Sequence, residues 1–87
     1  MKFEWDPKKA RSNLRKQKVS FEEAATALSD PMAATGADPD HSIGEDRYIT
    51  FGVSERDWLL VVAHTEEGET VRIISARVTS KGERRIL

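Results

Sequence analysis

A nearly uninterrupted apolar segment, Trp58-Leu59-Leu60-Val61-Val62-Ala63, most strongly constrains the fold of this chain. A strand with successive apolar side chains is covered on both faces, so it belongs inside a sheet. Two further apolar stretches, residues 47–53 and 71–78, flank this strand, which we place at residues 58–65. The connections at residues 54–57 and 66–70 are short enough for hairpins. The sequence therefore predicts an antiparallel meander with the apolar strand in the middle.

The N-terminal half predicts one short strand, two helices and another short strand. Phe3 and Trp5 alternate with polar residues, as in a half-buried strand. Asp6-Pro7 is typical of a helix start, and a second helix starts at Ser20 and stops at Asp30-Pro31. Residues 32–35 could form a strand, before a loop over residues 36–46. We expect an α+β fold, β-α-α-β-β-β-β, with an antiparallel sheet packed by the two helices and a short C-terminal helix.

Charged residues are distributed unevenly, although the net charge is only −1. Residues 1–18 carry seven Lys or Arg against two acids, and residues 72–87 carry five against one. Residues 19–46, in contrast, carry seven acids and no Lys or Arg. Two basic ends around an acidic middle predict one basic face opposite an acidic face.

Length and composition exclude several classes of protein. A chain of 87 residues has room for one core, so residues 1–87 form a single domain. The absence of cysteine excludes disulfides and thiolate metal sites. No apolar run reaches the ~18 residues of a membrane helix and no signal peptide is evident, so we expect a cytoplasmic protein. The loop contains five possible metal ligands, Asp38, Asp40, His41, Glu45 and Asp46. Their spacing matches no calcium-binding loop, and we expect neither a metal nor a cofactor.

Arginines gather toward the end of the sequence, at positions 72, 77, 84 and 85. The planar guanidinium fork matches phosphate, so several arginines on adjacent elements indicate a nucleic-acid ligand. With a loop over residues 66–70, His64 would lie opposite Arg72 and share its face of the sheet. There His64 could act as a general acid or base. The structural alternative is a histidine at a strand end that bonds to backbone.

Arg77 lies five positions after Arg72, so the two point to opposite faces of a regular strand. Both can line one site only if a β-bulge interrupts the strand or if one of them acts from the edge of the sheet. We favour Arg77 for the site because it adjoins Glu83 and Arg84. Glu83 could transfer a proton, but Ser80-x-x-Glu83 also fits a helix capping box.

Two N-terminal residues are candidates for RNA contacts. Trp5 could belong to the core or could stack on a base, a contact that contributes about 1–3 kcal/mol. Lys18 and the lysines of the first helix could bind phosphates, or they could simply form a solvated helix face.

Short motifs extend over essentially the whole chain: Phe3-x-Trp5-Asp6, Val19-Ser20-Phe21-Glu22-Glu23-Ala24, Asp30, His64-Thr65, Arg72-Ile73-Ile74-Ser75-Ala76-Arg77 and Glu83-Arg84-Arg85. In this order and at this spacing they resemble the BrnT family of bacterial toxins. The resemblance implies a RelE-like fold and an RNA endonuclease that inhibits translation. It also implies a BrnA antitoxin with a ribbon-helix-helix DNA-binding part, two toxins assembling with two antitoxins, and DNA contact only through the antitoxin.

By position, the resemblance assigns catalysis to His64, Arg72, Arg77, Glu83 and Arg84, and RNA contacts to Trp5, Lys18 and Arg85. The expected reaction is metal-independent: a 2′-hydroxyl attacks the adjacent phosphate, arginines neutralise the charge, and His64 or Glu83 transfers protons. Two alternatives are a non-catalytic module that binds nucleic acid or an acidic partner segment, and an inactive homologue kept for autoregulation with its antitoxin. Salt-dependent binding without product would favour either alternative.

Overall fold

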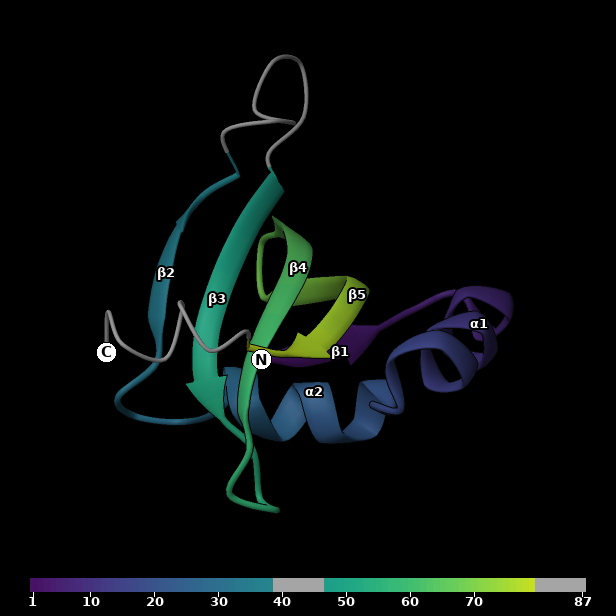
Figure 1. Cartoon of the computed structure of the whole chain (residues 1–87). Helices are drawn as coiled ribbons and strands as arrows, with labels where there is room; N and C mark the ends of the chain where they lie inside the picture. The colour runs from purple at the N-terminus through teal and green to yellow at the C-terminus, as the bar shows by residue number, and fades with distance from the viewer. Residues whose placement is uncertain (39–46, 80–87) are drawn as a thin grey trace.

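The computed structural model describes residues 1–38 and 47–79 of the chain. Two helices and a five-stranded sheet form an α+β fold, which confirms the predicted class (Figure 1). In chain order the elements are β1 (Lys2–Glu4), α1 (Pro7–Gln17), α2 (Phe21–Leu28), β2 (Ala34–Ala37), β3 (Arg47–Val53), β4 (Leu59–Glu67) and β5 (Thr70–Val78). The predicted C-terminal helix and most of the predicted acidic loop lie outside the described residues. In the described part, no helix is long and apolar enough to cross a membrane.

The sheet is mixed, in the order β1-β5-β4-β3-β2. Strands β2 to β5 form an antiparallel meander with β4 in the middle. The prediction of a wholly antiparallel sheet is wrong at one edge, because β1 pairs in parallel with β5. Parallel neighbours need a long connection, which the intervening helices and strands supply. This pairing places Phe3 beside Val71 and packs its ring against the core.

The hydrophobic core lies between the sheet and α2. Leu60 and Val62 of β4 are fully buried and pack with Phe21 and Ala24 of α2. The approach is closest at Gly52 of β3, where an added Cβ would collide with a backbone carbonyl of α2. The helices therefore cover one face of the sheet, and neither of the two described helices covers the opposite face, which we call the open face.

Side-chain hydrogen bonds cap the N-terminus of both helices. The amide of Lys8 donates to the Asp6 carboxylate at 2.9 Å, and the amide of Glu23 donates to Ser20 Oγ at 3.0 Å. Ser20-x-x-Glu23 also fits a capping box, but only half of it forms, because the Glu23 carboxylate instead accepts a 2.7 Å bond from the Ser54 hydroxyl. Glu23 thus connects α2 to the turn between β3 and β4.

Several strand boundaries in β2, β4 and β5 differ from the prediction. β2 begins at Ala34, two residues late, because a turn occupies residues 30–33, where the Ala33 amide donates to the Asp30 carbonyl at 3.0 Å. β4 and β5 extend until only Gly68 and Glu69 separate them, in place of the predicted five-residue loop. Gly68 has φ +60°, a conformation that suits glycine in a two-residue hairpin turn.

Candidate nucleic-acid interface

A β-bulge in β5 places Arg72 and Arg77 on the same face of the sheet. Arg72 pairs with Thr65 and Arg77 pairs with Val61, two residues of β4 that share one face. The pairing skips Ile74, since Ala63 pairs with Ser75 whereas His64 pairs with Ile73. One extra residue on β5 restores the parity that a regular strand would break. The β-bulge that allows both arginines to line one site is therefore present.

The two arginines lie on the open face of the sheet, opposite the face that packs against α2. The side chain of Arg72 is 49% exposed, and Arg77 is also exposed. Arg72 approaches Glu4 of β1 at 3.5 Å. An exposed ion pair of this kind contributes little to stability, so a phosphate can replace the carboxylate at small cost.

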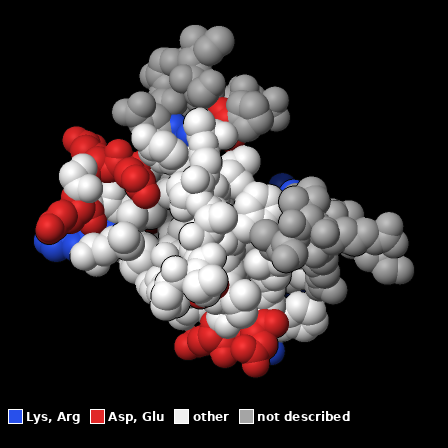
Figure 2. All heavy atoms as spheres, turned by 90° about the vertical axis from the view of Figure 1, so that its left-hand side faces the viewer, with Lys and Arg blue, Asp and Glu red and all other residues white. Residues whose placement is uncertain are grey.

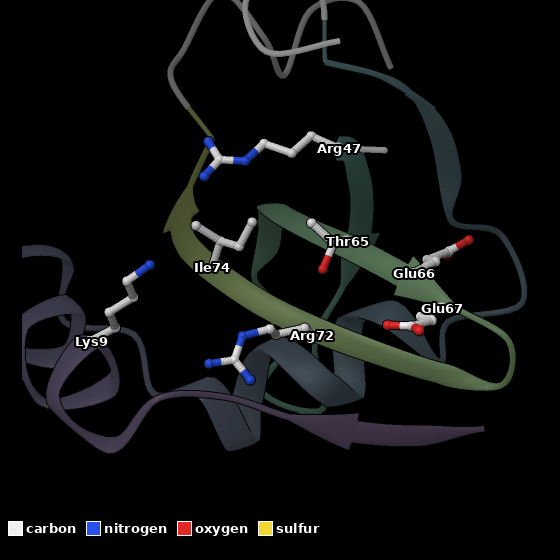
Figure 3. A pocket seen from close by; sticks show the side chains of 7 residues that line it. All are labelled: Lys9, Arg47, Thr65, Glu66, Glu67, Arg72 and Ile74. Carbon is white, nitrogen blue, oxygen red and sulfur yellow. The ribbon is translucent and has the colours of Figure 1, made fainter. Parts of the chain in front are cut away.

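Arg72 also lines a groove of about 580 Å³. Figure 3 shows its cationic side chains converging from three elements: Lys9 from α1, Arg47 from β3 and Arg72 from β5. A smaller hollow of about 210 Å³ continues along α1 past Lys16 and shares Lys9 and Ile74 with the groove. The lining of the larger part is Lys9, Arg47, Thr65, Glu66, Glu67, Arg72 and Ile74. We name these two hollows together the cationic groove.

The cationic groove joins the two basic ends of the sequence, because Lys9 belongs to the first and Arg72 to the second. Sequence reasoning did not assign Lys9, Lys16 or Arg47 to the site individually. Arg47 could have been predicted from its position at the start of β3. There it pairs with Thr65, which in turn pairs with Arg72. Three cations from three separate elements can contact successive phosphates of one strand.

His64 does not face Arg72, so the predicted pairing of these two residues is wrong. The two-residue turn shifts the register by one, and a shift of one residue moves a side chain to the opposite face. His64 shares the helix-covered face with Leu60 and Val62 and is only 1% exposed. His64 does not line the cationic groove, although its neighbour Glu66 does, and its catalytic role stays a prediction.

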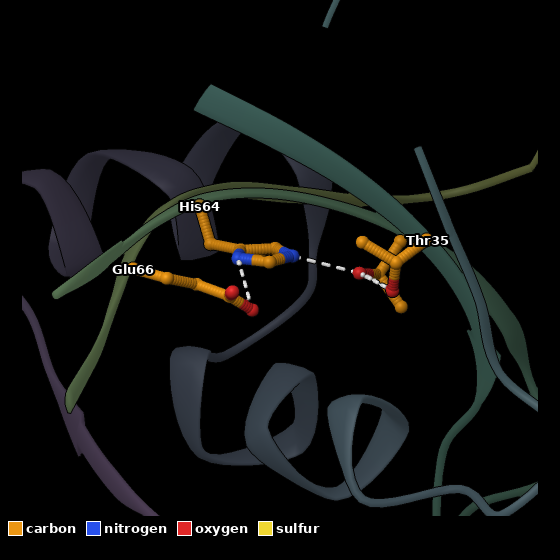
Figure 4. Close-up of polar contacts among 4 residues, drawn as sticks. Thr35, His64 and Glu66 are labelled. Atoms are coloured by element: carbon orange, nitrogen blue, oxygen red, sulfur yellow. Dashed lines mark hydrogen bonds and ion pairs between the residues drawn. The ribbon is translucent and has the colours of Figure 1, made fainter. Parts of the chain in front are cut away.

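His64 instead belongs to a chain of polar side chains that is buried at His64 and Thr50 and reaches exposed residues at both ends (Figure 4). Its Nε2 lies 2.7 Å from Thr50 Oγ1, which in turn lies 2.7 Å from Thr35 Oγ1 on β2. On the other side, His64 Nδ1 lies 3.7 Å from the Glu66 carboxylate. These contacts link β2, β3 and β4 on the helix-covered face of the sheet.

Burial lowers the pKa of His64 below its usual value of 6.5, although the Glu66 carboxylate partly opposes the shift. The folded protein therefore holds a neutral His64 at a pH where the unfolded chain binds a proton. The free energy of unfolding should consequently fall as the pH drops below about 6.5, by at most ~1.4 kcal/mol per pH unit from this residue. Urea unfolding of wild-type and His64→Gln proteins between pH 7.5 and 5 tests this, and the variant should show the weaker decline. Parallel declines in both proteins would show that another group is responsible.

Trp5 and Lys18, the two N-terminal candidates, lie apart from the cationic groove. Trp5 packs edge-on against Phe21, with ring centroids 5.9 Å apart, and its exposed part lines a hollow with Arg11 and Leu14. Lys18 ends α1 in a left-handed conformation, with φ 61°, and its side chain is exposed. Their contacts with RNA stay predictions.

Asn13 of α1 is a structural residue that sequence reasoning missed. Its side-chain nitrogen donates to the carbonyls of Val19 and Ala76, both at 2.9 Å, and its oxygen accepts from the Ala76 amide at 3.1 Å. β1 pairs with β5 only at residues 70–72. At Ala76, the Asn13 side chain makes the two backbone hydrogen bonds that a neighbouring strand would make. It thereby holds α1, and with it Lys9, against β5.

The remaining predicted site residues, Glu83, Arg84 and Arg85, lie outside the described residues. Within residues 1–38 and 47–79, no group of three or more His, Cys, Asp or Glu side chains is placed to hold a metal ion.

A small α+β fold with arginines on the open face of its sheet and lysines on the adjoining helix α1 fits the class of proteins that bind nucleic-acid phosphates. Comparison with known families identifies the class: the model of the family described as "Ribonuclease toxin, BrnT, of type II toxin-antitoxin system" matches residues 5–83. The chain belongs to this family of ribonuclease toxins, which confirms the resemblance and the predicted endoribonuclease function. An RNA substrate and an antitoxin partner follow from this membership.

A similar solved structure is the crystal structure of the Brucella abortus ribonuclease toxin BrnT, at 1.1 Å resolution. The two folds superpose with a TM-score of 0.72 and 25% sequence identity, over 93% of this chain and 99% of that chain. A comparison with curated proteins found no match.

Proposed function

We propose that the cationic groove and the neighbouring Arg77 bind the RNA strand at the bond to be cleaved, and that cleavage needs no metal ion. The observation that carries this proposal is the bulge at Ile74, which puts Arg72 and Arg77 on one exposed face. Lys9 and Arg47 approach the same face from other elements. Such a set of fixed cations can bind a phosphate whose negative charge increases during the reaction.

In the proposed reaction, the 2′-oxygen of one nucleotide attacks the adjacent phosphorus while the bond from phosphorus to the 5′-oxygen breaks. The products are a 2′,3′-cyclic phosphate and a 5′-hydroxyl. Arg72 and Arg77 stabilise the charge on the non-bridging oxygens. One proton leaves the 2′-hydroxyl and one reaches the 5′-oxygen. We assign both transfers to the family position Glu83, because His64 is buried on the opposite face of the sheet and a guanidinium keeps its proton. Arg84 would add positive charge beside the phosphate. We further propose that the fold is RelE-like.

The lysines along α1 support single-stranded RNA as the substrate. Lys9 and Lys16 both line the cationic groove, and they lie about two helical turns apart on one side of α1. A strand whose reacting phosphate lies at Arg72 could continue along this row, with its backbone phosphates near the lysines. Trp5, Lys18 and Arg85 would add contacts beyond the reacting bond.

The antitoxin partner is proposed to be of the BrnA type, with a ribbon-helix-helix part that binds DNA. Two toxins would assemble with two antitoxins, and the complex would repress its own operon. The toxin itself would act in the cytoplasm on RNA and reduce translation.

Cleavage of a labelled single-stranded RNA in the presence of EDTA tests the proposal. We expect cleavage that yields 2′,3′-cyclic phosphate ends and that weakens as salt rises, because the substrate is held through phosphates. An oligonucleotide of the same sequence with 2′-deoxyriboses is the control, and it should remain intact. Cleavage that requires added Mg²⁺, or that proceeds equally on the deoxy control, would contradict the proposed mechanism.

A further inference from the structure

Strand β2 lies at the edge of the sheet formed by the described residues. All four of its residues, Ala34 to Ala37, are exposed, and β2 is the last strand of the sheet. Within residues 1–38 and 47–79, nothing pairs with its outer side. None of the four carries a charge, although charges are a common means of protecting an edge strand from pairing.

The register identifies the backbone groups that point outward. The Asp38 amide donates to the Arg47 carbonyl at 3.0 Å, so this pair is of the hydrogen-bonded type. Pairs alternate along an antiparallel ladder, so Gly36 and Ala34 also bond to β3. The amides and carbonyls of Thr35 and Ala37 therefore point away from β3. These four groups are spaced to receive another strand.

Beside this edge lies an apolar groove of about 350 Å³ on the open face of the sheet. Ile49 and Phe51 of β3 form its floor next to β2. Figure 2 shows a broad uncharged surface on this side of the molecule, with acidic side chains at its margins. Every second residue of an added strand would place its side chain on this face.

We propose that β2 is an antitoxin docking edge, where an extended, uncharged segment of the antitoxin adds a sixth strand and places an apolar side chain over Ile49 and Phe51. This proposal rests on the antitoxin partner, and not on the site or mechanism of RNA cleavage. An antitoxin segment can continue past β2 and bury further surface. A second copy of the toxin is a weaker occupant, because a four-residue strand with small side chains supplies little of the ~800 Å² per partner typical of stable interfaces.

Ala37→Pro is the most selective test, because proline removes an outward amide donor and leaves the bonds between β2 and β3 intact. The dissociation constant for the full-length cognate antitoxin, measured by calorimetry, should rise about ten- to a hundredfold, since a buried carbonyl of the partner loses its bond. The matched control Ala37→Ser retains the amide and should bind as the wild type does. Gly36→Lys, where an added Cβ meets nothing within 4 Å, should also weaken binding, whereas Gly36→Ala should not.

Hydrogen exchange of individual amides gives an independent readout. In the free toxin the amides of Thr35 and Ala37 should exchange faster than that of Gly36, and antitoxin should slow both. Unchanged affinity of Ala37→Pro together with unprotected Thr35 and Ala37 amides in the complex would overturn the proposal. Protection of these amides in the free toxin would also overturn the proposal. Protection that increases with toxin concentration would then indicate a second copy, and protection that does not would indicate another part of the same chain. RNA cleavage by Ala37→Pro without antitoxin should be normal, so failure of the docking proposal can be told apart from failure of the cleavage proposal.

Discussion

Replacement of Arg72 by alanine is expected to lower the single-turnover rate of RNA cleavage by about a hundred- to a thousandfold. That is the usual loss when one fixed donor to a developing negative charge is removed. The fold should be unaffected, because the Arg72 side chain is 49% exposed and its Glu4 partner is 54% exposed. The free energy of unfolding should change by less than ~1 kcal/mol.

The matched control for Arg72 is Arg56→Ala. Arg56 is an exposed arginine in the turn between β3 and β4, and it lines neither part of the cationic groove. It has the same charge and the same side chain, so its removal changes the net charge equally. Near-wild-type cleavage by the Arg56 variant would show that the loss at Arg72 depends on position and not on total charge.

Asn13→Ala is expected to lower the free energy of unfolding by about 2–5 kcal/mol. The substitution removes three hydrogen bonds and leaves the Ala76 amide and the carbonyls of Ala76 and Val19 without their partner. An unsatisfied buried polar group typically costs about 1–3 kcal/mol. Because small domains are stable by about 5–15 kcal/mol, this one substitution could remove much of the stability.

Urea denaturation of the Asn13 variant measures this loss. Gln17→Ala on the same helix is the control, because Gln17 is exposed and its replacement should change stability by less than ~0.5 kcal/mol. Equal stabilities of the Asn13 and Gln17 variants would contradict the role of Asn13 as the partner of the β5 edge.

The fold could be predicted well where local patterns determine it. The apolar run at residues 58–63 predicted the middle strand, and Asp6 and Ser20 predicted the two helix starts. The parallel pairing of β1 could not be predicted, because Phe3 and Val71 are far apart in the sequence and a three-residue strand carries no directional signal.

The candidate site depended on details that periodicity does not specify. The length of one turn decided the face of His64: a two-residue turn at Gly68 buries the ring, and the predicted longer loop would have exposed it beside Arg72. A single bulge at Ile74 decided whether Arg72 and Arg77 could act together. Neither feature has a sequence signal stronger than one glycine.

Arginines on the open face of the sheet are proposed to form the RNA-cleaving site. The most direct test is the rate at which Arg72→Ala, Arg77→Ala and Arg56→Ala proteins cleave a labelled single-stranded RNA in EDTA, with folding checked by circular dichroism. We predict that the Arg72 and Arg77 variants lose most of the activity and that the Arg56 variant cleaves at the wild-type rate. Full activity in folded Arg72 and Arg77 variants, or an equal loss in all three, would contradict it.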